Sequence, residues 1–264
     1  MPLPKPLTYE NLDSFQPLEF ILLLGPAGTG KSFAILSLAD AWRRLKPEGK
    51  IYTIDCETGL AKTYKAAFSH LENILIWHAD QVNDSDKFID IFTELGQIVT
   101  PDDWLCIESD TRVWDMCQDT GWLKVTGQLK DKYLSHRLVA GGPVTPQPDQ
   151  LWQIVLDAYR RRFRDVLVNE IRLKTNILIT TGLSSKSSPF IKGARQDAMK
   201  QLGINIVPDG HTENTRNPDT VIMLSREGDG YWAEILKDRG SDKPGKRVRF
   251  GVENFLLDFM SNCR

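Results

Sequence analysis

The sequence predicts an α/β protein, in which a mostly parallel central sheet is flanked by helices and followed by an antiparallel C-terminal extension. Two observations support this fold class. Short apolar runs alternate with longer segments of helical periodicity, and a glycine-rich turn separates the first apolar run from the first helical segment. Strands that alternate with helices form parallel sheets covered on both faces. The predicted parallel strands are Phe20–Leu24, Lys50–Asp55, Ile74–Trp77, Trp104–Ile107 and Asn176–Thr181.

Helical periodicity is clearest in three segments. Apolar residues recur every three or four positions in residues 32–45, 84–99 and 150–174, which predicts a helix in each. Asp149 is the expected N-cap of the last helix, because a proline-rich turn directly precedes it.

After the fifth strand the regular alternation stops. Residues 182–203 are polar and rich in Ser, Lys and Gly, which predicts a long functional or disordered loop. Strand-like segments resume at residues 220–224, 231–237 and 248–250, and the turn at residues 227–230 predicts a hairpin between the first two. Residues 252–260 are expected to form a short closing helix.

The bulk composition is that of an ordinary globular protein, with 264 residues of which 41% are hydrophobic and 26% charged. We expect one domain at residues 18–264, preceded by an N-terminal arm at residues 1–17 that packs on a neighbouring subunit. No apolar run approaches the roughly 20 residues of a bilayer span, and the N-terminus lacks a secretory pattern. The chain is therefore expected in the cytoplasm, without membrane contact, and in the host cytoplasm if it is viral. Its four cysteines contain no C-x-x-C pair, which argues against a zinc site or a disulfide framework.

The turn after the first strand matches the phosphate-binding pattern G-x-x-x-x-G-K-[ST]. Its glycines let backbone N–H groups surround an anion, and the following helix presents its positive end to that anion. Lys31 is expected to reach the β- and γ-phosphates, and the Ser32 hydroxyl to be a Mg²⁺ ligand. We therefore predict ATP and Mg²⁺ as cofactors, against the alternative of a glycine-rich turn without a ligand. The predicted nucleotide-binding residues are Gly25, Pro26, Ala27, Gly28, Thr29, Gly30, Lys31, Ser32 and Phe33.

Acidic residues follow two other predicted strands. Glu108 and Asp110 come directly after the strand at residues 104–107, and we expect one of them to bind the metal ion, with Glu108 at the usual position of the acid. Glu57 follows the second strand and is the predicted catalytic base, because the carboxyl ends of parallel strands meet at one edge of a sheet. The alternative is that these acids only cap buried strands or face solvent.

The order of these motifs resembles the RecA-like ATPase core, and in particular the phage-encoded single-strand annealing and recombination ATPases (AAA-type phage nucleotide-binding proteins). The resemblance covers residues 18–260 and includes the phosphate loop, an Asp-x-Glu-x-Gly motif from residue 55 and an acid-Ser-x-Thr motif from residue 108. It implies an ATPase in which Glu57 activates water. The family normally has aspartate where this chain has Glu108, a departure that lengthens the carboxylate arm.

The resemblance also implies an oligomer, a ring or filament with ATP at its subunit interfaces. Lys237 and Arg239 are similar to a pair that reaches the γ-phosphate of a neighbouring subunit, and they are counted with Glu57 and Lys31 as catalytic residues. The alternative is two solvated charges on a terminal strand. Thr181 takes the place of a sensor residue at the end of the fifth strand.

Single-stranded DNA is the expected partner. Ten basic residues face three acids between residues 160 and 200, and the resemblance places a DNA-contacting loop after the fifth strand. Lys186, Lys192 and Arg195 of that loop would pair with phosphates, and Phe190 would stack on a base. The alternative is a soluble linker. A single-strand binding protein or another replication or recombination protein is a further expected partner.

These observations favour an ATP-dependent recombinase or annealing protein that binds single-stranded DNA as an oligomer. The main alternative is an ATP-gated assembly or regulatory module that binds a protein partner with little DNA contact. A small-molecule kinase with a phosphate loop is a third reading, against which stands the absence of a recognisable lid or acceptor motif.

Overall fold

The structure is a computed structural model that describes residues 18–139, 148–184, 207–208, 216–239 and 244–250. The predicted N-terminal arm, most of the predicted loop at residues 182–203 and the predicted closing helix lie outside these residues. Within them, no helix has both the length and the apolar character needed to cross a bilayer.

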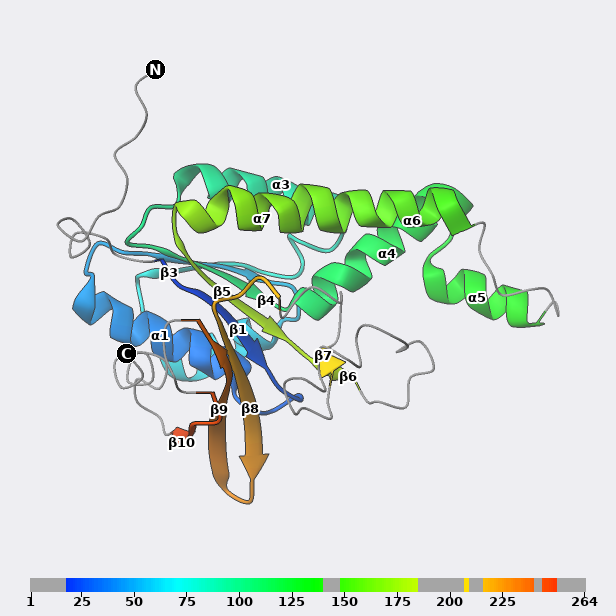
Figure 1. The fold of residues 1–264 in the computed structure, drawn as a ribbon. Coiled ribbons are helices and arrows are strands. Elements are labelled where there is room, and N and C mark those ends of the chain that lie inside the picture. Colours follow the sequence, from blue (N-terminus) through cyan, green and yellow to red (C-terminus); the bar gives the residue numbers. More distant parts are fainter. Residues whose placement is uncertain (1–17, 140–147, 185–206, 209–215, 240–243, 251–264) are drawn as a thin grey trace.

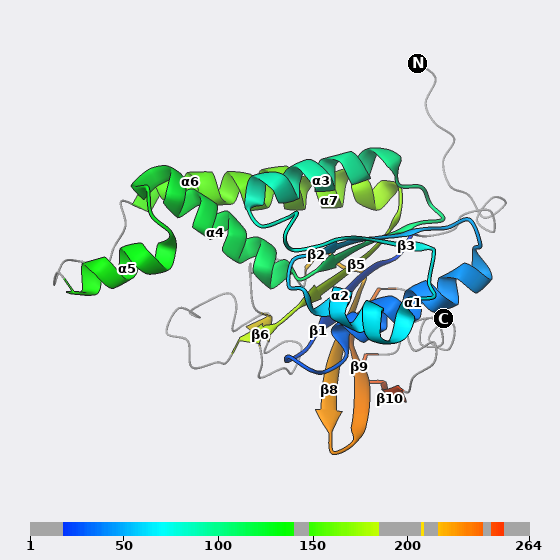
Figure 2. The same ribbon diagram turned by 180° about the vertical axis from the view of Figure 1, so that it is seen from behind.

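One sheet of eight strands organises the described residues (Figures 1 and 2). Its strands are β1 (Phe20–Leu24), β2 (Ile51–Asp55), β3 (Ile74–Trp77), β4 (Trp104–Glu108), β5 (Asn176–Thr181), β8 (Thr220–Glu227), β9 (Gly230–Asp238) and β10 (Arg247–Phe250). They lie in the order β10-β9-β8-β1-β5-β4-β2-β3. Pairing is parallel from β8 to β3 and antiparallel from β8 through β9 to β10. The predicted α/β architecture with an antiparallel C-terminal part is confirmed.

Helices cover both faces of this sheet. They are α1 (Lys31–Leu45), α2 (Gly59–Thr63), α3 (Ser85–Ile98), α4 (Asp110–Thr126), α5 (Lys130–Val139), α6 (Pro148–Leu156) and α7 (Val166–Asn169), with π-helical segments at Tyr64–Phe68 and Asp157–Asp165 and a 3₁₀ turn at Ile171–Leu173. Figure 2 shows α1 and α2 on one face, with α3, α4, α6 and α7 on the other.

Alternation along β1 shows how the sheet separates two cores. Phe20, Leu22 and Leu24 belong to the core beneath α3, α4 and α6, whereas Ile21 and Leu23 belong to the core beneath α1. Successive side chains of a strand point to opposite faces, so a strand covered on both sides is apolar at every position. This explains why β1 is readable from the sequence as an uninterrupted apolar run.

Three helical features differ from the prediction. The helices α4 and α5 were not expected, because polar residues such as Gln118 occupy buried positions of α4 and obscure its periodicity. The predicted N-cap Asp149 is wrong, since α6 already begins at Pro148. Proline is favoured in the first turn of a helix, where its missing N–H has no partner to lose. The predicted helix over residues 150–174 is divided among α6, the π-helical segment Asp157–Asp165, α7 and the 3₁₀ turn.

The C-terminal hairpin is confirmed. Strand β8 ends at Glu227, β9 begins at Gly230, and Gly228 between them has a φ of 57°, a conformation that favours glycine. Within the predicted loop, Leu183–Ser184 instead form a short strand, β6, which pairs antiparallel with β7 (Val207–Pro208). A hydrogen-bonded ladder thus joins residues 183–184, in the predicted loop, to residues 207–208, beyond its predicted end.

Candidate nucleotide-binding site

The predicted phosphate loop, residues 25–32, joins β1 to α1 at the carboxyl edge of the parallel strands. Gly30 is the N-cap of α1 with a φ of 94°, in the left-handed region that favours glycine. A Cβ atom added to Gly25 would lie 2.5 Å from Thr29 Oγ1 and 2.8 Å from the Leu224 carbonyl oxygen. The close approach of β8 and the tight return of the loop therefore require glycine at position 25.

The N-terminus of α1 is electrostatically suited to an anion. Its first turn contains no acidic residue, and no side chain caps it. The first amide groups of a helix have no intrahelical partner, and they lie at the positive end of the helix dipole. In many helices an acidic side chain or a capping hydroxyl accepts hydrogen bonds from these amides. The 15-residue α1 has neither, so its first amides could donate to a phosphate group.

Lys31 lies within this loop rather than in open solvent. Its Nζ donates hydrogen bonds to the carbonyl oxygens of Gly25 and Pro26, at 2.8 and 2.9 Å. Burial lowers the pKa of Lys31, whereas the charges of Glu57 and Glu108 act to raise it. The ammonium group thus shares its electrostatic surroundings with both acids that the sequence singled out.

Glu108 is brought directly to the phosphate loop. The Ser32 hydroxyl donates a hydrogen bond to Glu108 Oε1, while Oε2 is buried and has no hydrogen-bond partner in the described part of the chain. The side chain is only 3% exposed. Burial raises the pKa of Glu108 to about 7, the negative charges of Asp55 and Glu57 act in the same direction, and the hydrogen bond from Ser32 opposes them. A buried carboxylate oxygen without a partner is a group that a cation would satisfy.

The donor set at this point fits Mg²⁺ bound together with a phosphate. Mg²⁺ usually takes one or two protein oxygens and completes its shell with phosphate and water oxygens. Ser32 and Glu108 supply two such oxygens. No cluster of three or more His, Cys, Asp or Glu residues suited to a metal ion exists among the described residues, so a metal held by protein ligands alone does not match the residues present there.

Asp110, the second predicted metal ligand, lies in a different environment. It is fully buried, and both carboxylate oxygens accept hydrogen bonds from the Tyr159 hydroxyl, at 2.9 and 2.8 Å. Tyr159 belongs to the π-helical segment, so this contact directs Asp110 toward the helical layer. Of the two acids, the structure brings Glu108 to Ser32 and ties Asp110 to Tyr159.

The loop after β2 is folded around a buried carboxylate. Asp55 Oδ1 accepts from the Glu57 amide and Oδ2 from the Ala61 amide, each at 3.1 Å. A Cβ atom added to Gly59 would lie 3.6 Å from Ser32 Oγ, so the loop packs directly on the phosphate loop. Asp55 therefore holds the chain in the path that places Glu57 beside the site.

Glu57 is exposed but held in position. Ser109, the residue after β4 and the N-cap of α4, donates a hydrogen bond from its hydroxyl to Glu57 Oε1. Two hydrogen-bonded pairs, Ser32–Glu108 and Ser109–Glu57, thus lie at the carboxyl edge of the sheet, since Glu108 and Ser109 are consecutive residues. The predicted catalytic base and the predicted metal ligand meet there.

Thr181, the predicted sensor position, is tied to the same edge. Its hydroxyl is 3.0 Å from that of Thr111 on α4, and its carbonyl oxygen accepts from the Gly25 amide at 3.3 Å. Thr181 therefore connects the end of β5 with both α4 and the start of the phosphate loop.

Lys237 and Arg239 lie at the opposite edge of the sheet, where the parallel strands begin, beside the first residues of β8. Lys237 Nζ donates to the carbonyl oxygens of Arg216 and Pro218, at 3.0 and 2.6 Å. Arg239 donates to the Arg216 carbonyl at 2.9 Å and contacts Asp219 at 3.3 Å. Burial and neighbouring guanidinium groups lower the pKa of Lys237 to about 8. Both cations are bonded within the described chain, at the opposite edge of the sheet from the predicted phosphate loop.

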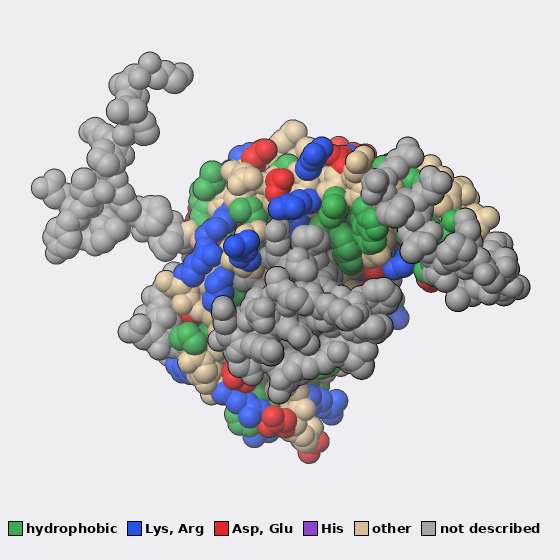
Figure 3. Space-filling model, turned by 45° about the vertical axis from the view of Figure 1, so that its right-hand side comes forward, with side chains coloured by type: hydrophobic (Ala, Val, Ile, Leu, Met, Phe, Trp, Pro, Cys, Tyr) green, Lys and Arg blue, Asp and Glu red, His purple; other side chains and the backbone are tan. Residues whose placement is uncertain are grey.

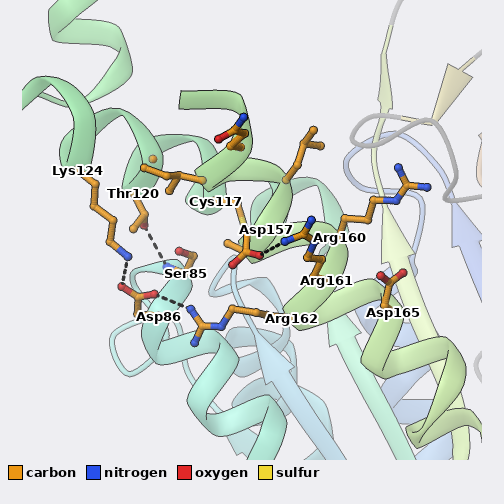
Figure 4. Close-up of a pocket in the computed structure, with 15 residues that line it drawn as sticks. Ser85, Asp86, Cys117, Thr120, Lys124, Asp157, Arg160, Arg161, Arg162 and Asp165 are labelled. Atoms are coloured by element: carbon orange, nitrogen blue, oxygen red, sulfur yellow. Dashed lines mark hydrogen bonds and ion pairs between the residues drawn. The ribbon is translucent and has the colours of Figure 1, made fainter. Parts of the chain in front are cut away.

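The four predicted DNA-contacting residues, Lys186, Phe190, Lys192 and Arg195, lie outside the described residues. A groove of about 1020 Å³ occurs elsewhere, among α3, α4, α6 and the π-helical segment (Figure 4). No residue of the phosphate loop lines it. Asp86 within it bridges Lys124 and Arg162, at 2.7 and 3.2 Å.

Three residues of the site were not assigned a role from the sequence. Asp55 and Ser109 stand inside the motifs that were recognised, but their hydrogen bonds depend on the way β2 and β4 lie next to each other. Tyr159 carried a weak signal, because a tyrosine on the apolar side of a helix needs a partner for its hydroxyl. Comparison of the chain with protein-family models finds no match, and comparison with curated proteins finds none either.

Proposed function

We propose that this protein is a magnesium-dependent ATPase with a RecA-like core, which acts on single-stranded DNA as an oligomer in annealing or recombination. The observation that carries the proposal is the hydrogen bond from Ser32 to Glu108, with one Glu108 oxygen left over, beside the anion-suited end of α1. A phosphate loop that served only as a turn has no need of a buried acid at this place.

Each residue has a task in this proposal. The amides of the phosphate loop and Lys31 bind the phosphates, while Ser32 and Glu108 would hold Mg²⁺. When bound, the ion offsets negative charge on the phosphates and orients them. Glu57 orients the attacking water and accepts its proton, and the hydrogen bond from Ser109 fixes the direction of the carboxylate.

The oligomeric part of the proposal uses Lys237 and Arg239. Because both lie at the far end of the sheet from their own phosphate loop, a phosphate that they contact would belong to a neighbouring subunit. Their bonds to residues 216–219 hold them at that surface. Hydrolysis would then depend on assembly, since each site needs cations from the next subunit.

Calorimetry and turnover test the proposal together. Wild-type protein with Mg²⁺ should take up ATP and hydrolyse it, and Lys31→Ala should abolish turnover. Lys62→Ala, which removes an exposed lysine from the nearby α2, is the matched control and should retain turnover. Absence of any binding heat in folded protein would refute the nucleotide site. Turnover that is indifferent to single-stranded DNA at low salt would refute the DNA-dependent part alone.

A further inference from the structure

Trp152 on α6 forms an exposed aromatic plate. Its side chain is 40% exposed and stacks on Trp114 of α4, with ring centroids 6.4 Å apart and planes inclined by 17°. Scattered exposed apolar residues are ordinary. An exposed indole that is held parallel to a second indole is different, because its orientation is set before any partner arrives.

The plate adjoins a cationic part of the surface. The π-helical segment that continues α6 contains four arginines and two aspartates. On α6 the groove of Figure 4 begins at Gln153, the residue after Trp152, and it is lined by Lys124 and residues 160–162 together with three aspartates. Hydrophobic side chains lie beside Lys and Arg side chains on the face shown in Figure 3.

The cations of the groove are held by weak pairs. The Arg161 side chain is 79% exposed and meets Asp157 at 3.2 Å, and Arg162 is 42% exposed and meets Asp86 at 3.2 Å. Exposed ion pairs of this kind contribute little stability, so their guanidinium groups are available to a phosphate at small cost. The exposed ring of Trp152 is therefore followed along the helix by exposed guanidinium groups that suit phosphates.

A series of contacts leads from the plate to the nucleotide site. Trp114 meets Tyr159 edge to face, with centroids 4.9 Å apart, and the Tyr159 hydroxyl donates to both oxygens of Asp110. Asp110 is the first residue of α4, and Ser109, the N-cap of the same helix, donates to Glu57. Packed and hydrogen-bonded groups thus connect the plate with the start of α4.

We infer that Trp152, stacked on Trp114, binds an unpaired base of single-stranded DNA, and that Tyr159 and Asp110 link this binding to the position of Glu57. The inference rests on the proposed ATPase function for its second part only. Base stacking suits any sequence, because every base has an aromatic face. A stable contact between copies of the chain would instead bury about 800 Å² on each partner, whereas the exposed large apolar side chains of α6 among the described residues are Trp152 and Leu156.

Binding of fluorescein-labelled oligo-dT to the full chain, followed by anisotropy at low salt, tests the plate. Trp152→Ala should weaken binding about 5- to 100-fold, the range expected for loss of one stacked base, and Trp152→Phe should restore most of it. Trp77→Ala is the matched control, because Trp77 also stacks on an aromatic ring, that of Tyr52, at 6.3 Å and 30°. Its affinity should stay within about twofold of wild type.

Three results would refute base binding by Trp152. They are no DNA binding by the wild type, equal DNA affinity of Trp152→Ala and wild type, or a change in oligomer mass in Trp152→Ala without a change in DNA affinity. The last would make this face an interface between copies. ATP turnover without DNA binding would support the ATPase and refute base binding by Trp152. DNA binding that depends on Trp152, in a protein without ATP turnover, would support base binding by Trp152 and refute the ATPase.

Tyr159→Phe tests the link, because it keeps the ring against Trp114 and removes the donor to Asp110. DNA affinity should stay within about twofold, while stimulation of ATP turnover by single-stranded DNA should fall at least about fivefold. Trp114→Phe, which weakens the edge-to-face contact, serves if Tyr159→Phe does not fold. Unchanged stimulation in the folded variant would show that the contacts do not couple the two sites.

Discussion

The Ser32 hydroxyl donates a hydrogen bond to Glu108, a residue 76 positions further along the chain. The two meet because β1 and β4 both pair in parallel with β5, which aligns their carboxyl ends at one edge. The phosphate loop leaves the end of β1, and Glu108 is the last residue of β4. Parallel pairing thus creates a two-oxygen site from residues that have no local relation.

Separate substitutions of Glu108 and Asp110, the two acids near the end of β4, should distinguish their roles. Glu108→Gln removes a charge from the proposed Mg²⁺ donor set, so turnover should fall by about 100-fold or more, as for loss of one electrostatic group at an active site. Asp110→Asn should keep its affinity for Mg-ATP, at a stability cost of about 1–3 kcal/mol from the altered Tyr159 contact. Titration of turnover with Mg²⁺, alongside urea unfolding, measures both. Equal Mg²⁺ dependence in the two variants would assign the metal to neither acid.

Loss of the Ser109 hydroxyl should affect turnover more than binding. Ser109→Ala frees Glu57 from its hydrogen bond, so kcat should fall about tenfold or more with little change in KM. The variant also loses the N-cap of α4, worth about 1 kcal/mol. Asp84→Ala is the matched control, since Asp84 caps α3 through the Lys87 amide. It should lose similar stability and keep full turnover. A parallel loss of kcat in Asp84→Ala would show that destabilisation alone explains the effect.

Glycine at position 25 should be required for both stability and nucleotide binding. The Cβ of Gly25→Ala would clash with Thr29 and the Leu224 carbonyl, at a cost of about 1–3 kcal/mol, and should lower ATP affinity at least about tenfold. Gly127→Ala is the comparison, because Gly127 has a φ of 73° and open space for a Cβ. It should cost about 1–2 kcal/mol of backbone strain and leave ATP affinity unchanged. Thermal unfolding and calorimetry distinguish the two.

Lys237 should make stability depend on pH. Its pKa in the folded protein is lowered to about 8 from 10.5, so between these values the unfolded chain holds more protons than the folded one. The free energy of unfolding should therefore rise with pH across this window because of Lys237. Lys237→Met should remove that part of the rise in urea unfolding series at pH 7.5 to 10.5. An identical slope in both proteins would contradict the lowered pKa.

Local patterning was sufficient to predict much of the fold. The parallel strands were recognisable because a strand covered on both faces is apolar throughout, and the hairpin at residues 227–230 because glycine stands where the backbone must turn. The pattern of the predicted phosphate loop was equally visible, since a phosphate-binding turn uses consecutive backbone groups. Helix α4 was not, because its buried positions include polar and small residues such as Gln118 and Gly121.

The pairing of side chains across the sheet required the assembled structure. Glu108 and Asp110 are two residues apart, and the sequence favoured Glu108 as the metal ligand but left Asp110 as an alternative. In the structure one meets Ser32 and the other meets Tyr159 of the π-helical segment. Which side of a strand end a carboxylate faces depends on the order of strands and on the helices packed above them. Those are long-range relations, and no nearby residue encodes them. The sequence therefore contains the strands and the loop, whereas the choice between neighbouring acids arises from the way distant segments pack.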